Sequence, residues 1–340
     1  MELSLNNISV ALSGKEILNS ISLTVEDGAL VSLLGVSGCG KSTLLKTIAG
    51  IITPSCGSVF LDGVCADRLP PHKRGTVIVF QDLRLFPHMT VAENIAFPLK
   101  MRGAAREEAE RATRELLEKV QLEGFEGRKI REMSGGQMQR VALARALAAK
   151  PNILLLDEPF SNLDENLRQD MRKLVLKLQQ DYRITTVLVT HDRQEALSMS
   201  DKIALMMHAR ILQFDTPENI YNVPDSRDVA DFFGDAAYAE GIVEGNIFRC
   251  EIGEIRVEKP DGRYQAMLRP GAVCVGRDGI EKNFQITEIN YRGEDYGVVL
   301  TKKDSGFQLR AFVPSSGGLR TGDTVSVSVK PDRIFLFPVS

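Results

Sequence analysis

The stretch GVSGCGKST, at positions 35–43, lies between a run of branched apolar residues and the segment LLKTIAG. In order, its residues are Gly35, Val36, Ser37, Gly38, Cys39, Gly40, Lys41, Ser42 and Thr43. Glycines allow a tight turn in which backbone N–H groups approach a ligand, and a row of such groups before a helix binds anions. The lysine adds a mobile positive charge, and the hydroxyl beside it can ligate a hard cation. The spacing G-x-x-x-x-G-K-[ST] is that of a phosphate-binding loop.

The flanking segments match the context that this loop requires. Residues 30–34 (LVSLL) are typical of a short buried strand in a parallel sheet. After Ser42, Leu44, Leu45 and Ile48 recur at helical spacing, and Gly50 suits a helix C-terminus. The alternative is an ordinary glycine-rich junction between a strand and a helix. Because the motif and both flanks agree, we favour a nucleoside triphosphate site.

Length and composition limit the classes of protein that remain. A chain of 340 residues is long enough for two domains, each with its own core. The net charge of −3 argues against a broad nucleic-acid-binding face, and no window has the uncharged apolar length of a membrane span. The start MELSLNNISV lacks the pattern of a signal peptide. The five cysteines form no C-x-x-C pair, which favours a reducing cytosol over a disulfide framework or a metal cluster.

Two regions with different patterns follow each other along the chain. Residues 1–235 alternate short apolar runs (77–80, 153–156 and 186–189) with helical patterns, which predicts an α/β domain with a mainly parallel sheet. Within it we expect a helical subdomain at about 87–140, including a charged amphipathic helix at 104–122. Residues 236–340 show strand-like alternation and turn residues, which predicts a small all-β domain, a barrel or a sandwich.

Three further segments place polar side chains after predicted strands. The segment ILLLDEP ends in Asp157 and Glu158; the first carboxylate can support a nucleotide's Mg²⁺ and the second can orient or deprotonate an attacking water. His191 follows the strand pattern VLVT, and Gln81 follows TVIVF. Each of these two residues, taken alone, is as well explained by an ordinary polar strand end. A kinase, a GTPase, a helicase and a transport ATPase all remain open at this point.

The segment MSGGQMQRVALARALAAKP distinguishes between these classes. Its first residues are Ser134, Gly135, Gly136 and Gln137. Serine is a good N-cap, and the backbone amides of the helix start form a second anion site; a simply capped helix is the alternative. Two anion sites but one catalytic carboxylate suggest that the second site serves a neighbour's nucleotide. This implies a head-to-tail dimer with ATP between the subunits.

Taken together, GVSGCGKST, Gln81, MSGGQ, ILLLDEP, SNLD and His191 resemble the motif set of the ATP-binding-cassette (ABC) ATPases, in the right order over roughly the first 235 residues. The resemblance implies that Gly35–Thr43 bind the phosphates, that Ser42, Gln81 and Asp157 hold Mg²⁺, and that Glu158, His191 and Gln81 are the catalytic residues. It implies that Ser134, Gly135, Gly136 and Gln137 bind the ATP of the opposite subunit and that Asp164 lies in the loop that crosses the interface. Leu12 stands where the family usually stacks an aromatic ring on adenine, which predicts modest ATP affinity and poor discrimination against GTP.

The order of the two domains narrows the resemblance. An ATPase domain followed by an all-β domain is similar to importer ATPases with a C-terminal oligonucleotide-binding-like regulatory domain. These work as homodimers on the cytoplasmic face of the inner membrane, under permease subunits that a periplasmic or surface solute-binding protein supplies. The C-terminal segments RCEIGEIRVE, MLRPGAVCV and RIFLFP resemble those of ferric iron importers. Polyamine (spermidine/putrescine), phosphonate and sulfate importers are the alternatives, followed by a soluble non-transport ABC ATPase and a regulatory module without turnover.

Overall fold

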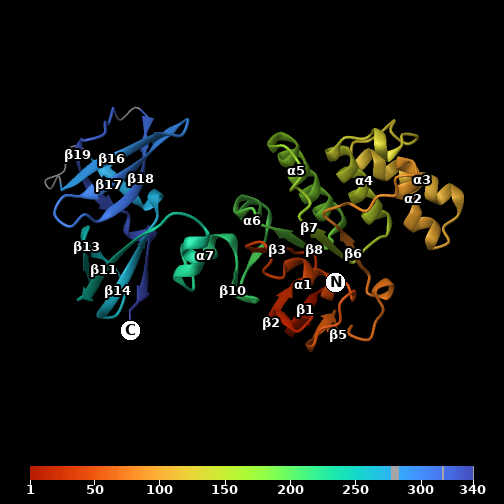
Figure 1. Ribbon diagram of the computed structural model, residues 1–340, viewed down its shortest axis with the longest axis horizontal. Helices are drawn as coiled ribbons and strands as arrows, with labels where there is room; N and C mark the ends of the chain where they lie inside the picture. The colour runs from red at the N-terminus through yellow and green to blue at the C-terminus, as the bar shows by residue number, and fades with distance from the viewer. Residues whose placement is uncertain (277–282, 316–317, 340) are drawn as a thin grey trace. The chain divides into compact units, whose positions relative to one another are not determined.

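The computed structural model describes residues 1–276, 283–315 and 318–339 (Figure 1). Over these residues the chain divides into two compact units, Met1–Pro217 and Glu218–Ser340. Among the described residues, no helix combines the length and the apolar character that crossing a membrane would need.

The first unit is built on a six-stranded sheet. Its order is β10 (Arg210–Asp215), β9 (Lys202–Met207), β3 (Leu30–Gly35), β8 (Thr185–Thr190), β7 (Ile153–Asp157) and β6 (Thr76–Val79). All neighbouring strands are parallel except β10 and β9. Every residue of β3 and β8 is buried, as expected of strands covered on both faces. The mainly parallel α/β fold is confirmed, and it brings the carboxyl ends of β3, β8 and β7 together.

A second, antiparallel sheet completes the first unit and was not predicted. Its order is β2 (Lys15–Val25), β1 (Leu3–Leu12), β4 (Cys56–Leu61) and β5 (Val64–Cys65). Leu3, Leu5, Ile8 and Val10 of β1 are buried in one hydrophobic cluster with α1 (Lys41–Ile48) and with residues of β3, β7 and β8. The helix that follows the phosphate-binding loop is therefore packed from two sides. A 3-10 turn (Pro71–Lys73) and the helices α5 (Glu165–Tyr182) and α6 (Arg193–Met199) belong to the same unit.

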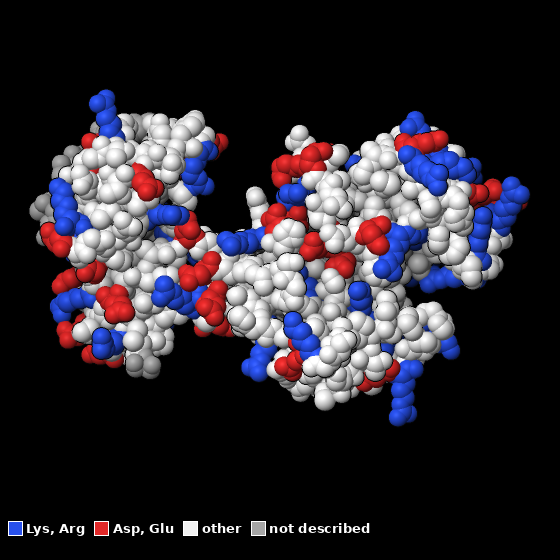
Figure 2. Space-filling model, viewed as in Figure 1, with Lys and Arg blue, Asp and Glu red and all other residues white. Residues whose placement is uncertain are grey.

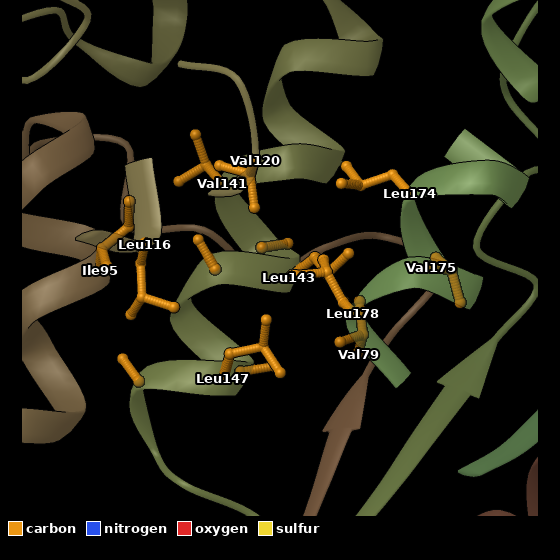
Figure 3. Close-up of a cluster of buried hydrophobic side chains, with 14 of the residues drawn as sticks. Val79, Ile95, Leu116, Val120, Val141, Leu143, Leu147, Leu174, Val175 and Leu178 are labelled. Carbon is orange, nitrogen blue, oxygen red and sulfur yellow. The ribbon is translucent and has the colours of Figure 1, made fainter. Parts of the chain in front are cut away.

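A helical region packs against the β6 edge of the six-stranded sheet. It comprises α2 (Val91–Met101), α3 (Arg106–Lys119), a 3-10 turn (Ile130–Glu132) and α4 (Gly135–Ala148). Figure 3 shows its core, in which Val141, Leu143 and Leu147 of α4 meet side chains from α2, α3, β6 and α5. The helix expected at 104–122 is shorter, because Ala105 has extended backbone and Val120 ends the hydrogen-bonded turns.

The second unit consists of two short helices followed by two antiparallel sheets. The helices are α7 (Pro217–Asn222) and α8 (Arg227–Phe232). One sheet has the order β13 (Gly253–Arg256), β12 (Ile247–Cys250), β11 (Ala237–Glu244), β14 (Gly262–Leu268) and β20 (Ile334–Pro338). The other has the order β15 (Val273–Gly276), β19 (Thr324–Val329), β16 (Phe284–Tyr291), β17 (Asp295–Lys302) and β18 (Gln308–Pro314). Two 3-10 turns (Pro270–Ala272 and Pro331–Arg333) join strands within the unit. The prediction of an all-β domain after the α/β domain is confirmed.

The division between the units falls after Pro217, the first residue of α7, whereas the change in sequence pattern places it at residue 235. Arg269, a buried residue just after β14, explains the difference. Its guanidinium donates to the carbonyls of Tyr221 (3.2 Å) and Ala230 (3.1 Å), and it lies 4.1 Å from the centroid of the Tyr221 ring. These contacts attach both helices to the β strands that follow them.

Candidate nucleotide-binding and hydrolysis site

The phosphate-binding loop joins β3 to α1, as the sequence predicts. A side chain at Gly35 would place a Cβ atom 2.1 Å from the backbone oxygen of Met206 in β9, so only glycine fits there. Gly38 has a φ of +81° and open space around it, a conformation that favours glycine and leaves its backbone exposed. The buried Lys41 donates from Nζ to the carbonyls of Gly35 (2.8 Å) and Val36 (2.9 Å). The loop thus has a cation at its centre and accessible backbone along its rim.

Two of the three residues predicted to hold a metal, Ser42 and Asp157, meet at the ends of α1 and β7. Ser42 donates from Oγ to Oδ1 of Asp157 at 2.9 Å. Burial raises the pKa of Asp157 above its ordinary value, and the neighbouring Glu158 carboxylate adds to this rise, while the Ser42 hydrogen bond opposes it. Hydroxyl and carboxylate oxygens are ligands that Mg²⁺ prefers. A hollow of about 410 Å³ opens beside them, and its lining includes Asp157, Gln81 and Lys46.

Glu158 lies next in the chain and has a left-handed backbone conformation, with φ +47°. Its N–H donates to the carbonyl of Val189 in β8 at 3.0 Å, which holds the turn in place. Its Oε2 atom lies 3.4 Å from Nδ1 of His191 and 3.5 Å from Nε2 of Gln81. Strained backbone of this kind concentrates at functional sites. The structure therefore brings three sequence-predicted residues from three strand ends around one carboxylate.

Two residues of this region were missed by sequence reasoning. Ser161 accepts a hydrogen bond from Gln81 Nε2 (3.3 Å) and donates to the carbonyl of Glu158 (3.1 Å). Arg145 of α4 donates to the carbonyls of Leu83 (2.8 Å) and Arg84 (2.8 Å), just after Gln81. The loop of Gln81 is therefore attached to α4. The only signal in the sequence is one arginine in the apolar run VALARALA.

Ser134 lies at the N-cap of α4, also as predicted. Its Oγ accepts from the N–H of Gln137 at 3.4 Å, and the Gln137 side chain accepts from the N–H of Ser134 at 3.0 Å. This reciprocal pair is a capping box. Ser134 and Gly135 are exposed, while Gly136 is buried beside Leu163 and Leu167. Within one chain, no hydrogen bond of the described residues joins Ser134 or Gln137 to residues 35–43.

The two remaining predicted residues lie at the ends of secondary structure elements. Asp164 is the N-cap of α5 and accepts from the N–H of Leu167 at 3.0 Å. Leu12 ends β1, opposite Lys15 in β2, and 43% of its surface is exposed. Its exposed side chain offers a small apolar surface without a ring.

A phosphate-binding loop, a strand-end Asp-Glu pair and a capped helix start on a mainly parallel sheet define a P-loop nucleotide-binding protein. Residues 18–161 match the family described as ABC transporter. The chain is 40% identical over 313 residues to the Fe(3+) ions import ATP-binding protein FbpC of Vibrio cholerae, a match that covers 90% of this chain and 89% of that protein. It is 39% identical over 352 residues to the spermidine/putrescine import ATP-binding protein PotA of Pseudomonas aeruginosa, with 97% of each chain covered.

Among solved structures, the chain is similar to the dimeric post-hydrolysis state of the ATP-binding cassette MJ0796 bound to ADP and Pi. The TM-score is 0.58 at 32% identity, and the match covers 63% of this chain and 98% of that one. The chain belongs to the ABC transporter family, and the resemblance that the motifs suggested is confirmed.

Proposed function

We propose that this chain is the ATP-hydrolysing, energy-coupling subunit of an ABC importer. The observation that supports this most directly is the arrangement around Glu158. Its carboxylate faces His191 and Gln81, and its neighbour Asp157 is hydrogen-bonded to Ser42 of the phosphate-binding loop. This is the arrangement that hydrolysis of a nucleoside triphosphate requires.

In this proposal the backbone N–H groups of residues 35–43 bind the phosphates of ATP. The Nζ of Lys41 leaves the carbonyls of Gly35 and Val36 to contact the β- and γ-phosphates. Ser42, Asp157 and Gln81 hold Mg²⁺, whose donor set of hydroxyl, carboxylate and amide oxygens they supply. When bound, that ion neutralises charge on the phosphates. A bound cation would also favour the ionised form of Asp157, because it would offset the burial and the repulsion from Glu158 that raise the pKa of Asp157.

The hydrolytic step follows from the position of Glu158. A water oriented by its carboxylate attacks the γ-phosphorus, the bond to the bridging oxygen of ADP breaks, and the water's proton passes to the carboxylate or the departing phosphate. His191, at the end of β8, contacts the γ-phosphate and keeps the Glu158 carboxylate in place through their 3.4 Å contact. Gln81 lies between this carboxylate and Ser161 and responds to movement of the loop that Arg145 attaches to α4.

The N-terminus of α4 contributes to the nucleotide site of a second copy of the chain. Three observations support this: Ser134 and Gly135 are exposed, the amides of the first turn are only partly satisfied by the capping box, and the chain's own phosphate loop already has its cation and carboxylate. Two ATP molecules would then lie between two chains arranged head to tail. Asp164, at the start of α5, lies in the segment proposed to cross that interface.

A groove between α2 and α3 is our proposed docking site for the membrane permease. It has a volume of about 680 Å³, and its lining includes four small side chains (Ala92, Ala96, Ala104 and Ala109). Three acidic residues (Glu93, Glu110 and Glu126) and three basic residues (Lys100, Arg106 and Arg114) line it as well. Small apolar side chains among charges of both signs suit a short helix of a partner protein. Phe86, in the segment before α2, is only partly exposed because its ring packs on that of Phe97, with the ring centroids 4.7 Å apart.

Docking on a permease would place the chain at the cytoplasmic face of the inner membrane as a peripheral protein. A periplasmic or surface solute-binding protein would supply the permease. For the solute we propose ferric iron, as named for the FbpC relative. Spermidine and putrescine are the second candidates, because the PotA relative aligns over 97% of both chains.

The test replaces the carboxylate of Glu158 by an amide. Glu158→Gln should bind ATP, accumulate as an ATP-trapped dimer and lose about 10²–10⁴-fold in turnover, because the amide cannot accept the proton. Full turnover in this variant would refute the role of Glu158. In cells, the variant should abolish uptake of labelled ferric iron and leave labelled putrescine uptake unchanged. The reverse result would assign the chain to a polyamine importer. Glu26→Gln, at an exposed ion pair with Lys202, is the matched control and should behave as wild type.

A further inference from the structure

A cluster of buried charges lies behind the Glu158 turn, and the mechanism above does not use it. Its centre is Glu195 of α6, whose side chain is 6% exposed. One carboxylate oxygen accepts from Arg172 Nη2 at 3.1 Å and the other from Thr190 Oγ1 at 2.5 Å. Arg168 Nε lies 3.9 Å from the same carboxylate. Burying so many charges costs desolvation free energy, and an apolar cluster would stabilise the fold at least as well. The cluster therefore points to a role other than stability.

The cluster joins two loops that are far apart in the sequence. On one side, Thr190 accepts from the N–H of Asp192 at 3.0 Å, and Arg172 lies 3.6 Å from the Asp192 carboxylate, so both residues that flank His191 belong to it. On the other side, Arg168 donates from Nη2 to the carbonyl of Leu163 at 3.2 Å. Leu163 immediately precedes Asp164. The His191 loop and the segment 161–164 are therefore connected through Arg168 and Glu195.

The connection is incompletely satisfied. Within the described part of the chain, the Nε atoms of Arg168 and Arg172 are buried and lack a hydrogen-bond partner. A small cavity of about 40 Å³ is lined by Arg168, and its lining also includes Glu158, Ser161, His191 and Glu195. Buried donors without acceptors cost free energy, and a rearrangement that satisfies them is favoured. The unsatisfied donors therefore favour a rearrangement of the cluster, and the adjoining cavity provides space for it.

We propose that Arg168 and Glu195 are positioning residues that couple the His191 loop to the segment 161–164, and so transmit the state of one nucleotide site to the other. This rests on the proposed function, in which His191 contacts the γ-phosphate of the chain's own ATP and Asp164 lies at the interface with the second copy. When His191 engages a γ-phosphate, Thr190 and Glu195 shift with it. Arg168 then moves the Leu163 carbonyl, and with it the backbone that reaches the partner's site.

The test measures cooperativity of ATP hydrolysis by the full chain as well as its rate. Arg168→Met removes the donor to Leu163 at a partly exposed position (25%), so the variant should fold. Its kcat should fall about tenfold, because misplacing a catalytic loop has effects of this size. Its Hill coefficient for ATP should fall from the wild-type value toward about 1, since the two sites no longer communicate. Nucleotide affinity of the dilute monomer and Tm should stay close to wild type.

Four further variants separate coupling from simple destabilisation. Thr190→Val cuts the same connection at its other end and should lower the Hill coefficient in the same way. The double variant, which carries Arg168→Met and Thr190→Val, should have the same Hill coefficient and kcat as either single variant, because both substitutions act on one connection. Arg168→Lys retains the charge beside Glu195 but not the forked donor, so it should recover part of the cooperativity. Arg249→Met, which removes an exposed ion-paired arginine of the second unit, is the control.

Two outcomes would overturn the proposal. The first is a wild-type Hill coefficient and kcat in both Arg168→Met and Thr190→Val. The second is additive losses in the double variant, which would indicate two separate structural effects. The failure of the proposed function looks different: the wild-type chain itself would then lack cooperative ATP hydrolysis, and Glu158→Gln would trap no dimer.

Discussion

In the proposed function the starts of two helices, α1 and α4, bind phosphate, and the two regions are built differently. At α1, Gly35 and Gly40 of the preceding loop pack against β9 and β2, Lys41 lies at its centre, and Ser42 is hydrogen-bonded to Asp157. At α4, the first turn is exposed and closed only by the capping box of Ser134 and Gln137. A helix N-terminus attracts anions in both places, but only the first has the cation and the carboxylates that chemistry needs. This difference is the physical argument for the proposal that the second region is half of a site and that two chains share each nucleotide.

The strongest test of this comparison is Ser134→Arg. The long cationic side chain would fill the space in front of α4 that the proposal gives to the partner's nucleotide. Hydrolysis should be abolished when both copies carry the substitution, while ATP binding by the monomer stays at the wild-type level, because the region around α1 is untouched. Phosphate release and equilibrium dialysis at low protein concentration measure the two quantities.

A matched control accounts for the loss of a helix cap. Ser226→Arg removes the N-cap of α8 in the second unit, where Ser226 accepts from the N–H of Val229. Loss of a cap costs about 1 kcal/mol in either variant, but only Ser134→Arg should lose hydrolysis. If monomer binding vanished together with hydrolysis, the two regions would not be separate sites and the comparison would fail.

A smaller effect is expected at Leu12, which would contact the base rather than the phosphates. Leu12→Tyr adds the ring that stacks on a base, worth about 1–3 kcal/mol, so the dissociation constant for ATP should fall by about tenfold. The wild-type chain should bind and turn over ATP and GTP comparably. Leu12→Met is the control without a ring. Strong ATP selectivity in the wild type would show that another residue of the region around α1 recognises adenine.

The smallest effect concerns stability. It tests a difference between the two regions, because the region around α1 includes the partly buried Asp157 and the exposed start of α4 has no such acid. Burial raises the pKa of Asp157, so the ionised form costs folding free energy, and the cost is fully present above the raised pKa. Asp157→Asn removes this cost and can still accept from Ser42. The nucleotide-free variant should therefore melt above wild type at neutral pH, at about 2–4 °C per kcal/mol in a domain of this size. Lowering the pH through the pKa of Asp157 should reduce the difference in Tm between the variant and wild type, because Asp157 in the wild type then becomes neutral. A variant that melts below wild type would contradict this reasoning.

Sequence alone identified the features that depend on neighbouring residues. The phosphate-binding loop, the Ser134 cap and the Asp157-Glu158 strand end are each encoded within about ten residues, and the structure places all three as expected. Alternation in β1 was equally local, yet its partner β4 lies some fifty residues further on, and the intervening α1 obscures the pairing. The β1–β4 pairing was missed for this reason, although β1 and β2 form a local hairpin within the same sheet.

The contacts that sequence reasoning could not reach are those of single long side chains. Arg145 reaches the carbonyls of Leu83 and Arg84, and Arg269 reaches those of Tyr221 and Ala230. Both guanidinium groups donate to backbone carbonyls, and a backbone target leaves no trace in residue type. On the face that Figure 2 draws, lysines, arginines and acidic residues are interspersed over both units, so the charge pattern does not single out a functional arginine.

Gly35 and Gly38 stand three positions apart in one loop but answer to different parts of the molecule. A side chain at Gly35 would collide with the backbone of β9, so its loss would separate strands and remove the folded chain along with its activity. A side chain at Gly38 would meet open space and would disturb only the loop itself. In evolution, selection for folding retains Gly35, and selection for function retains Gly38. A substitution at Gly38 can therefore inactivate the loop without unfolding the domain, and a descendant that lost hydrolysis could keep the fold for another use.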